Sequence, residues 1–200
     1  MKQWDVIKLG LVMMIYAAAA CVGLAFVYAG TEKIIEEREA ADLKAAITEL
    51  FPSAGSFDDV SGKITGGAEG VSFEKAYAIR QDGGIIGVAL QAVTGSYGGP
   101  IKVLVGVNTE GVISRVRVLE HTDTPGLGAN AAKSAYYVDK KRKITFYDQF
   151  ENKPIGDGFE PKKDVIAITA ATITSAAVSR AVKAAGEAAL AWIEANGGTN

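Results

Sequence analysis

An uncharged apolar run near the N-terminus limits the folds that this chain can adopt. Residues 9–31 include no Asp, Glu, Lys or Arg. As an α-helix, a run of this length crosses a hydrocarbon core of about 30 Å. Lys2 and Lys8 precede the run, and basic residues favour the cytoplasmic side of a membrane. The sequence therefore predicts a single-pass protein of the cell inner (plasma) membrane, with a cytoplasmic tail over 1–8, a transmembrane helix over 9–31 and the remainder on the extracytoplasmic side.

Two alternatives involve cleavage of this run. The small residues at 17–20 would suit a signal peptide, and Ala18-Ala19-Ala20-Cys21 would place a lipid on Cys21. However, residues 22–29 remain apolar beyond Cys21, whereas a mature lipoprotein usually turns polar there. The whole run is also longer than the apolar region of a typical signal peptide. A retained membrane helix is therefore the preferred interpretation.

The composition excludes several classes of function. Lys and Arg total 21 against 23 Asp and Glu, so no basic excess is present to neutralise nucleic acid. One Cys and one His are too few for a zinc site, an iron–sulfur cluster or a haem with two His ligands. No nucleic-acid partner and no metal site are expected, and any redox chemistry requires an organic cofactor.

Residue patterns beyond the apolar run predict one α+β domain over 71–200, joined to the membrane helix by a helical stalk and loop over 32–70. Alternation of apolar residues, with Gly-containing turns, predicts antiparallel hairpins. Apolar residues near a 3.6-residue spacing predict helices. The expected elements are a helix over 32–50, a loop over 52–70, hairpin strands over 73–80, 85–93, 101–107 and 112–119, a short helix over 129–137, a buried strand over 165–168 and a helix over 175–196. The domain should thus contain an antiparallel sheet with flanking helices.

Three loops are richer in Gly, Pro and hydroxyl residues than a turn requires. They are residues 96–100, 121–128 and 169–174. The third lies before a predicted helix, where free backbone N–H groups and the helix dipole favour an anionic group such as a phosphate. Threonines at this position also serve as ordinary helix caps, so the residues alone leave both interpretations open.

The three loops together resemble the FMN-binding domain family of the Rnf and sodium-pumping NADH:quinone oxidoreductase complexes, in the form found in the Rnf G subunit. The family pattern Ser/Thr-Gly-Ala-Thr-x-Thr/Ser is similar to Thr169-Ala170-Ala171-Thr172-Ile173-Thr174. A Gly-Pro segment resembles Tyr97-Gly98-Gly99-Pro100-Ile101, and His-x-Glu-Thr-Pro-Gly-Leu-Gly resembles residues 121–128.

The resemblance implies FMN attached covalently to Thr174 through a phosphoester bond. It implies an electron-transfer subunit with no catalytic residues and no independent catalytic activity. The expected partners are the other membrane and peripheral subunits of an Rnf-type complex, a flavin transferase during maturation, and membrane lipid. Leu127 would pack on the flavin ring, and Thr122 or Thr124 would donate hydrogen bonds. The other expected cofactor-binding residues are Tyr97, Gly98, Pro125, Gly126, Thr169, Ala171 and Thr172.

The chain departs from the family pattern at three positions. Ala170 stands where the family has Gly, Asp123 where Glu is more usual, and Ile166 where many members have Asp. If Gly is required for a positive φ, Ala170 would slow or prevent flavin attachment. The alternatives are a non-redox binding or assembly module that has lost the flavin, the equivalent subunit of a sodium-pumping NADH:quinone oxidoreductase, or a soluble flavin-linked reductase.

Overall fold

The computed structural model describes residues 3–64 and 67–196. The chain divides into two compact units, Met1–Lys44 and Ala45–Asn200, and each is described by itself. The first unit consists of most of helix α1 (Gln3–Leu50), in which the predicted membrane helix and the predicted helix over 32–50 are continuous. Large apolar side chains such as Leu24 and Phe26 are exposed along it. The segment Ile7–Leu50 is long and apolar enough to cross a membrane, by length and composition, so it could be a membrane anchor.

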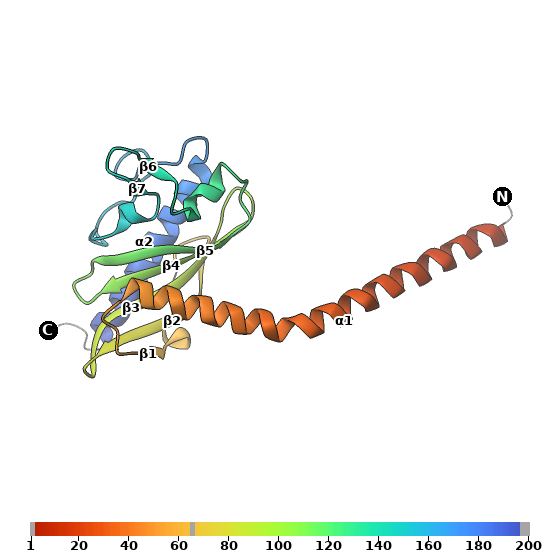
Figure 1. The fold of residues 1–200 in the computed structure, drawn as a ribbon, viewed down its shortest axis with the longest axis horizontal. Coiled ribbons are helices and arrows are strands. Elements are labelled where there is room, and N and C mark those ends of the chain that lie inside the picture. The colour runs from red at the N-terminus through yellow and green to blue at the C-terminus, as the bar shows by residue number, and fades with distance from the viewer. Residues whose placement is uncertain (1–2, 65–66, 197–200) are drawn as a thin grey trace. The chain divides into compact units, whose positions relative to one another are not determined.

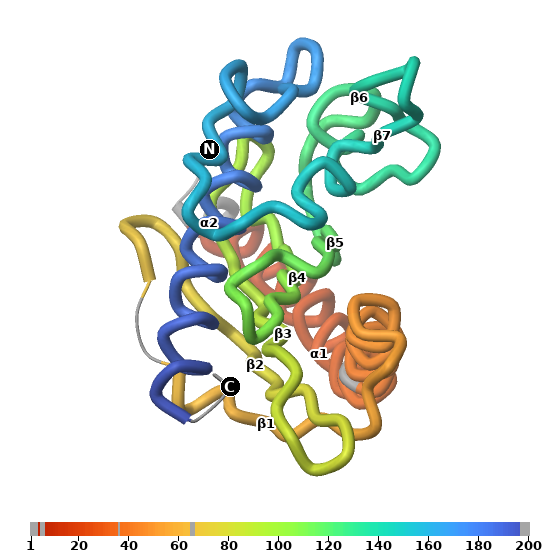
Figure 2. The backbone as a smooth tube through the Cα atoms, turned by 90° about the vertical axis from the view of Figure 1, so that its left-hand side faces the viewer, coloured from red at the N-terminus to blue at the C-terminus, as the bar shows by residue number. Residues whose placement is uncertain are grey.

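The second unit is built on a five-stranded antiparallel sheet in the order β1-β2-β3-β4-β5. Its strands are β1 (Ser56–Asp59), β2 (Val71–Gln81), β3 (Gly84–Gly95), β4 (Pro100–Asn108) and β5 (Ile113–His121). Helix α2 (Thr172–Ala195) contacts β3 and β4 and runs along one face of the sheet (Figures 1 and 2). The predicted α+β class and both predicted hairpins are confirmed.

The two faces of the sheet are covered differently because side chains alternate along each strand. Val103, Val105 and Val107 of β4 belong to the main core, to which α2 contributes residues such as Val178 and Val182. On the other face, the side chain of Phe51 occupies the space above Gly87 and Gly106. A Cβ atom on Gly87 would lie 2.4 Å from Val107 O and 2.7 Å from the Phe51 ring, and one on Gly106 would lie 2.9 Å from the ring. The close approach of the aromatic ring, and at Gly87 also of a backbone carbonyl, therefore requires glycine at both positions.

The predicted loop over 52–70 is wrong in part, because it contains β1 and the 3₁₀-helix η1 (Ser61–Lys63). Strand β1 is polar and short, so it lacks the apolar alternation that identifies a strand in sequence. It is held by antiparallel pairing with β2, in which Ser56 is opposite Arg80. Arg80 Nε also donates to Asp58 Oδ2 at 2.7 Å. Tertiary pairing, and not local propensity, makes this strand.

The predicted helix over 129–137 is replaced by two shorter elements. These are the 3₁₀-helix η2 (Gly128–Ala132) and strand β6 (Tyr137–Asp139), which pairs with β7 (Ile144–Thr145). The Asn130 side chain donates to Gly126 O at 2.7 Å, and this bond holds the chain in a tight turn. A further 3₁₀-helix, η3, covers Asp148–Phe150.

The predicted buried strand over 165–168 is also wrong. Val165 and Ile168 are buried as expected, but Ile166 is 47 % exposed. Side chains replace a neighbouring strand as hydrogen-bond partners: Ile166 N donates to Gln149 Oε1 at 2.8 Å, and Ile168 N donates to Ser175 Oγ at 2.9 Å. The segment is therefore held by amide and hydroxyl groups rather than by a sheet.

Candidate functional site

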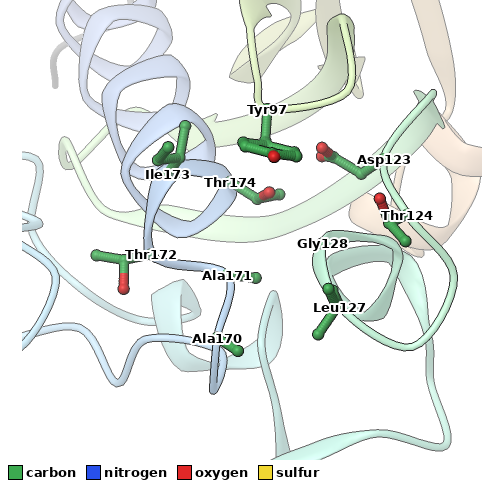
Figure 3. A pocket seen from close by; sticks show the side chains of 10 residues that line it. All are labelled: Tyr97, Asp123, Thr124, Leu127, Gly128, Ala170, Ala171, Thr172, Ile173 and Thr174. Atoms are coloured by element: carbon green, nitrogen blue, oxygen red, sulfur yellow. The ribbon is translucent and has the colours of Figure 1, made fainter.

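A cavity of about 420 Å³ lies where the three loops singled out in the sequence meet. A volume of this size is within the range of small-molecule and cofactor sites. Figure 3 shows Tyr97 and Leu127 on opposite sides of the cavity, with Thr174 between them. The lining residues are Tyr97, Asp123, Thr124, Leu127, Gly128, Ala170, Ala171, Thr172, Ile173 and Thr174. Loops far apart in the sequence thus build one site.

The N-terminus of α2 opens onto this cavity with unsatisfied donors. Ala171 is the N-cap residue and provides no side-chain cap. Among the residues that the structure describes, no backbone or side-chain acceptor bonds to the amides of Thr172, Ile173 or Thr174. Free amides at a helix N-terminus, with the positive end of the helix dipole, attract an anionic group. Ala170 and Ala171 are small enough for such a group to come close.

Thr174 is the nearly buried hydroxyl residue of the cavity wall. It is 1 % exposed, and no hydrogen bond of its hydroxyl occurs within the described part of the chain. Gly128 provides the space in front of it, since a Cβ atom at Gly128 would lie 2.5 Å from Thr174 Oγ1. Within the described part of the chain, the side-chain atoms that are fully buried without a partner are His121 Nδ1 and Ser179 Oγ, so the Thr174 hydroxyl opens to the cavity and is not sealed in the core. Its placement therefore favours a ligand that contacts or modifies Thr174.

Ala170 adopts the left-handed conformation that the family glycine would adopt without strain. Its φ is +59°. An L-residue with a Cβ atom pays about 1–2 kcal/mol for this conformation. The turn is nevertheless formed, with Ala171 N donating to Ile168 O at 3.0 Å. Ala170 therefore strains the turn without abolishing it.

Ser175 fixes the turn to the helix. Its side chain is fully buried. The hydroxyl accepts a hydrogen bond from Ile168 N at 2.9 Å and donates to Ala171 O at 2.9 Å. Both bonds link the residues before α2 to its first turn, so Ser175 positions the backbone that presents Thr174.

Asp123 is a cavity residue beyond those expected to bind the cofactor. It is 5 % exposed and lines the cavity. Its Oδ2 accepts a hydrogen bond from Ser96 Oγ at 2.6 Å, and its Oδ1 accepts one from Gly98 N at 2.8 Å. A single acidic residue in a loop of Gly, Thr and Pro was the available signal, because burial of a carboxylate requires such donors.

The expected cofactor-binding residues divide into two groups in the structure. Tyr97, Thr124, Leu127, Ala171, Thr172 and Thr174 come together around the cavity. Gly98, Thr122, Pro125, Gly126 and Thr169 do not line it. The Thr122 hydroxyl donates to Gly98 O at 3.0 Å, so it joins two loops. Thr169 lines a neighbouring depression together with Lys162 and Lys163. Glu160 beside Lys163 raises the pKa of that ammonium group above its usual value.

The sequence profile of the FMN-binding domain matches residues 96–187, a span that contains all three loops. Among curated relatives, the G subunit of the Na⁺-translocating ferredoxin:NAD⁺ oxidoreductase complex of Acetobacterium woodii is 30% identical over 197 residues, covering 90% of each chain. The G subunit of the proton-translocating ferredoxin:NAD⁺ oxidoreductase complex of Clostridium ljungdahlii is 30% identical over 168 residues, covering 82% of this chain and 80% of the relative.

A third curated relative, the G subunit of an ion-translocating oxidoreductase complex in Methanosarcina acetivorans, is 28% identical and covers 90% of this chain and 93% of its own. Among solved structures, Shewanella oneidensis NqrC is 20% identical with a TM-score of 0.46, over 60% of this chain and 61% of that one. The chain thus contains an FMN-binding domain. It belongs to the family of G subunits of ion-translocating oxidoreductase complexes.

Proposed function

We propose that this protein carries FMN covalently on Thr174 and passes electrons within a membrane complex that couples ferredoxin:NAD oxidation–reduction to ion translocation. The observation that carries the proposal is Thr174, a residue that is 1 % exposed and lines the cavity beside three free amides at the start of α2. Membership of the G-subunit family supplies the type of complex and its other subunits as partners.

The residues around the cavity fit the chemistry of FMN. The amides of Thr172, Ile173 and Thr174 would hold the phosphoryl group, and Ala170 and Ala171 leave space for it. Tyr97 and Leu127 offer apolar surface for the isoalloxazine ring on opposite sides of the cavity (Figure 3). Bound FMN supplies the capacity to accept and release electrons one at a time, and the protein sets its environment. The chain's own contribution is to bind, orient and partly enclose the ring.

Attachment of the cofactor requires a flavin transferase that uses FAD and Mg²⁺. In this step Thr174 Oγ1 forms a bond to the FMN phosphorus, the phosphoanhydride bond of FAD breaks and AMP leaves. The hydroxyl proton passes to a base of the transferase. Thr174 is thus an acceptor of modification and not a catalytic residue of this chain.

The proposed arrangement in the membrane has the N-terminus in the cytoplasm, one crossing by the apolar part of α1, and the FMN-binding domain on the extracytoplasmic side. The support is the length and composition of α1, together with Lys2 and Lys8 before its apolar part. The anchor would be surrounded by lipid and by other subunits of the complex.

The test is the intact mass of the full chain produced with and without the transferase. Wild-type protein should gain the mass of FMN less one water only with the transferase. Thr174→Ala should gain no mass. Thr172→Ala, which removes a nearby hydroxyl and keeps that of Thr174, should still be modified. No gain in the wild type, with the transferase active on another acceptor, would overturn the proposal. The alternative would then be the binding module without flavin, for which the strained Ala170 is the supporting observation.

A further inference from the structure

Tyr97 combines an exposed side chain with a tightly held backbone. Its side chain stands at the edge of the cavity and the residue is 73 % exposed. Large exposed residues on a turn usually sample several rotamers and backbone states. Here the residues on both sides of Tyr97 are hydrogen-bonded, and the turn is closed by Ser96 N donating to Gly99 O at 2.7 Å.

Asp123 makes the bonds that fix both neighbours of Tyr97. Ser96 Oγ donates to one carboxylate oxygen at 2.6 Å, and Gly98 N donates to the other at 2.8 Å. In Figure 3 the Asp123 carboxylate lies beside Tyr97. One buried side chain from the loop 121–128 therefore holds the turn 96–99 on both sides of its aromatic residue.

Backbone contacts also hold the turn 96–99 against the loop 121–128. The turn and the Asp123 side chain that bonds to it are called the clamp below. A Cβ atom at Gly98 would lie 2.4 Å from Thr122 O, and one at Gly99 would lie 2.5 Å from Thr122 Oγ1. The Thr122 hydroxyl also donates to Gly98 O at 3.0 Å. The turn can approach the second loop only because glycine is present at both positions. The geometry thus places Tyr97 at one site on the cavity edge.

We propose that Asp123 is a positioning residue: it pre-organises Tyr97, through Ser96 and Gly98, as an aromatic wall for the flavin ring. The proposal rests on the proposed function for the identity of the ligand. Pre-organisation lowers the entropy lost when the ring binds, because the Tyr97 backbone is already fixed. The turn needs an acceptor for Gly98 N and a hydrogen-bonding group for Ser96 Oγ at residue 123, and not a negative charge as such.

The variants that test this proposal separate shape from charge. Asp123→Asn keeps an oxygen for Gly98 N and offers an amide N–H to Ser96 Oγ, so it should preserve the clamp. Asp123→Ala removes both bonds. Tyr97→Leu removes the aromatic ring and leaves the clamp intact. Asp139→Ala is the matched control, since Asp139 accepts from Lys141 N and Arg142 N in a different turn.

The first measurement is amide hydrogen exchange of the full chain without flavin. Gly98 N–H should exchange at least about tenfold faster in Asp123→Ala, because its acceptor is lost. In Asp123→Asn and Asp139→Ala its exchange should remain near that of the wild type. Unchanged exchange in Asp123→Ala would overturn the clamp. This measurement does not depend on FMN, so it is independent of whether the proposed function holds.

The second measurement is the fluorescence of covalently bound flavin, normalised to flavin content by absorbance. A stacked tyrosine quenches flavin emission, so Tyr97→Leu and Asp123→Ala should both lose most of the quenching. Asp123→Asn should restore it. Equal loss in Asp123→Asn and Asp123→Ala would show that charge, and not positioning, is the role of Asp123. If no variant and no wild-type protein carried flavin, while Gly98 N–H exchanged faster in Asp123→Ala alone, the proposed function would be contradicted and the clamp would stand.

Discussion

At the scale of single residues, the left-handed conformation of Ala170 predicts a change in stability on substitution by glycine. Ala170→Gly should raise the free energy of unfolding by up to about 1 kcal/mol, because relief of the left-handed conformation exceeds the extra freedom of Gly in the unfolded chain. The measurement is denaturant unfolding of the purified protein. Ala188→Gly is the control, since Ala188 lies inside helix α2, where Gly is less favourable than Ala by about 1 kcal/mol. A loss of stability in Ala170→Gly equal to that in Ala188→Gly would refute the strain.

The tight packing around Gly128 predicts that a larger residue there is destabilising. Gly128→Ala would place a Cβ atom 2.5 Å from Thr174 Oγ1 and 2.8 Å from Asp123 Cγ. We expect it to lower the free energy of unfolding by about 1–3 kcal/mol through overpacking, and to reduce modification of Thr174 by the transferase. Thermal unfolding and intact mass measure the two effects.

Gly156→Ala is the control for Gly128→Ala, because no atom lies within 4 Å of a Cβ atom at Gly156. Its unfolding free energy should stay within about 0.5 kcal/mol of the wild type. If Gly128→Ala left the free energy of unfolding equally unchanged, the close contact of Gly128 with Asp123 and Thr174 would be absent in solution.

Site residues could be predicted from the sequence only where their role follows from local pattern. Thr174 was identified through its place before a helix and the resemblance of its motif, and the structure places it at the cavity. Asp123 and Gly128 act through contacts with residues remote in the sequence, which no spacing rule indicates. The sequence predicts that Thr122 or Thr124 donates to the flavin. In the structure Thr124 lines the cavity and the Thr122 hydroxyl donates to Gly98 O, a contact that depends on the docking of two loops.

At the scale of elements, two serines on α2 provide a matched pair. Ser175→Ala would leave the buried Ile168 N–H without its acceptor and should lower the free energy of unfolding by about 1–3 kcal/mol. Ser179 is also buried, but its hydroxyl has no partner among the described residues. Ser179→Ala should therefore be neutral or slightly stabilising.

The measurement is chemical denaturation of both serine variants under identical conditions. Equal destabilisation would show that Ser175 does not fasten the preceding segment to α2. A loss confined to Ser175→Ala would confirm that a side-chain hydroxyl, and not a strand partner, fixes the approach to the site.

The elements predicted correctly were those with strong local periodicity. Alternation and the turns at Gly83 and Gly111, which have φ of +88° and +72°, specify the two hairpins without help from the rest of the fold. The predictions for strand β1 and for the segment 165–168 were wrong for opposite reasons. The first is polar and depends on pairing with β2, and the second is apolar and β-branched but is bonded by Gln149 and Ser175.

At the scale of the whole molecule, the proposed sidedness can be tested with cysteine labelling. Cys21 is the one cysteine of the sequence, so Cys21→Ser gives a background without thiols. In this background Lys141→Cys, at an exposed position of the β6–β7 turn, should react with a membrane-impermeant maleimide in intact cells. Trp4→Cys should react only after permeabilisation. The reverse pattern would place the FMN-binding domain in the cytoplasm.

Peptide mapping tests whether FMN is joined to Thr174. Trypsin should release residues 164–180, which follow Lys163 and end at Arg180, as one peptide containing Thr169, Thr172, Thr174, Ser175 and Ser179. From protein made with the transferase, this peptide should carry the mass of FMN less one water, and fragmentation should assign it to Thr174. Assignment to another hydroxyl of the peptide, or an unmodified peptide beside an active transferase, would contradict the account.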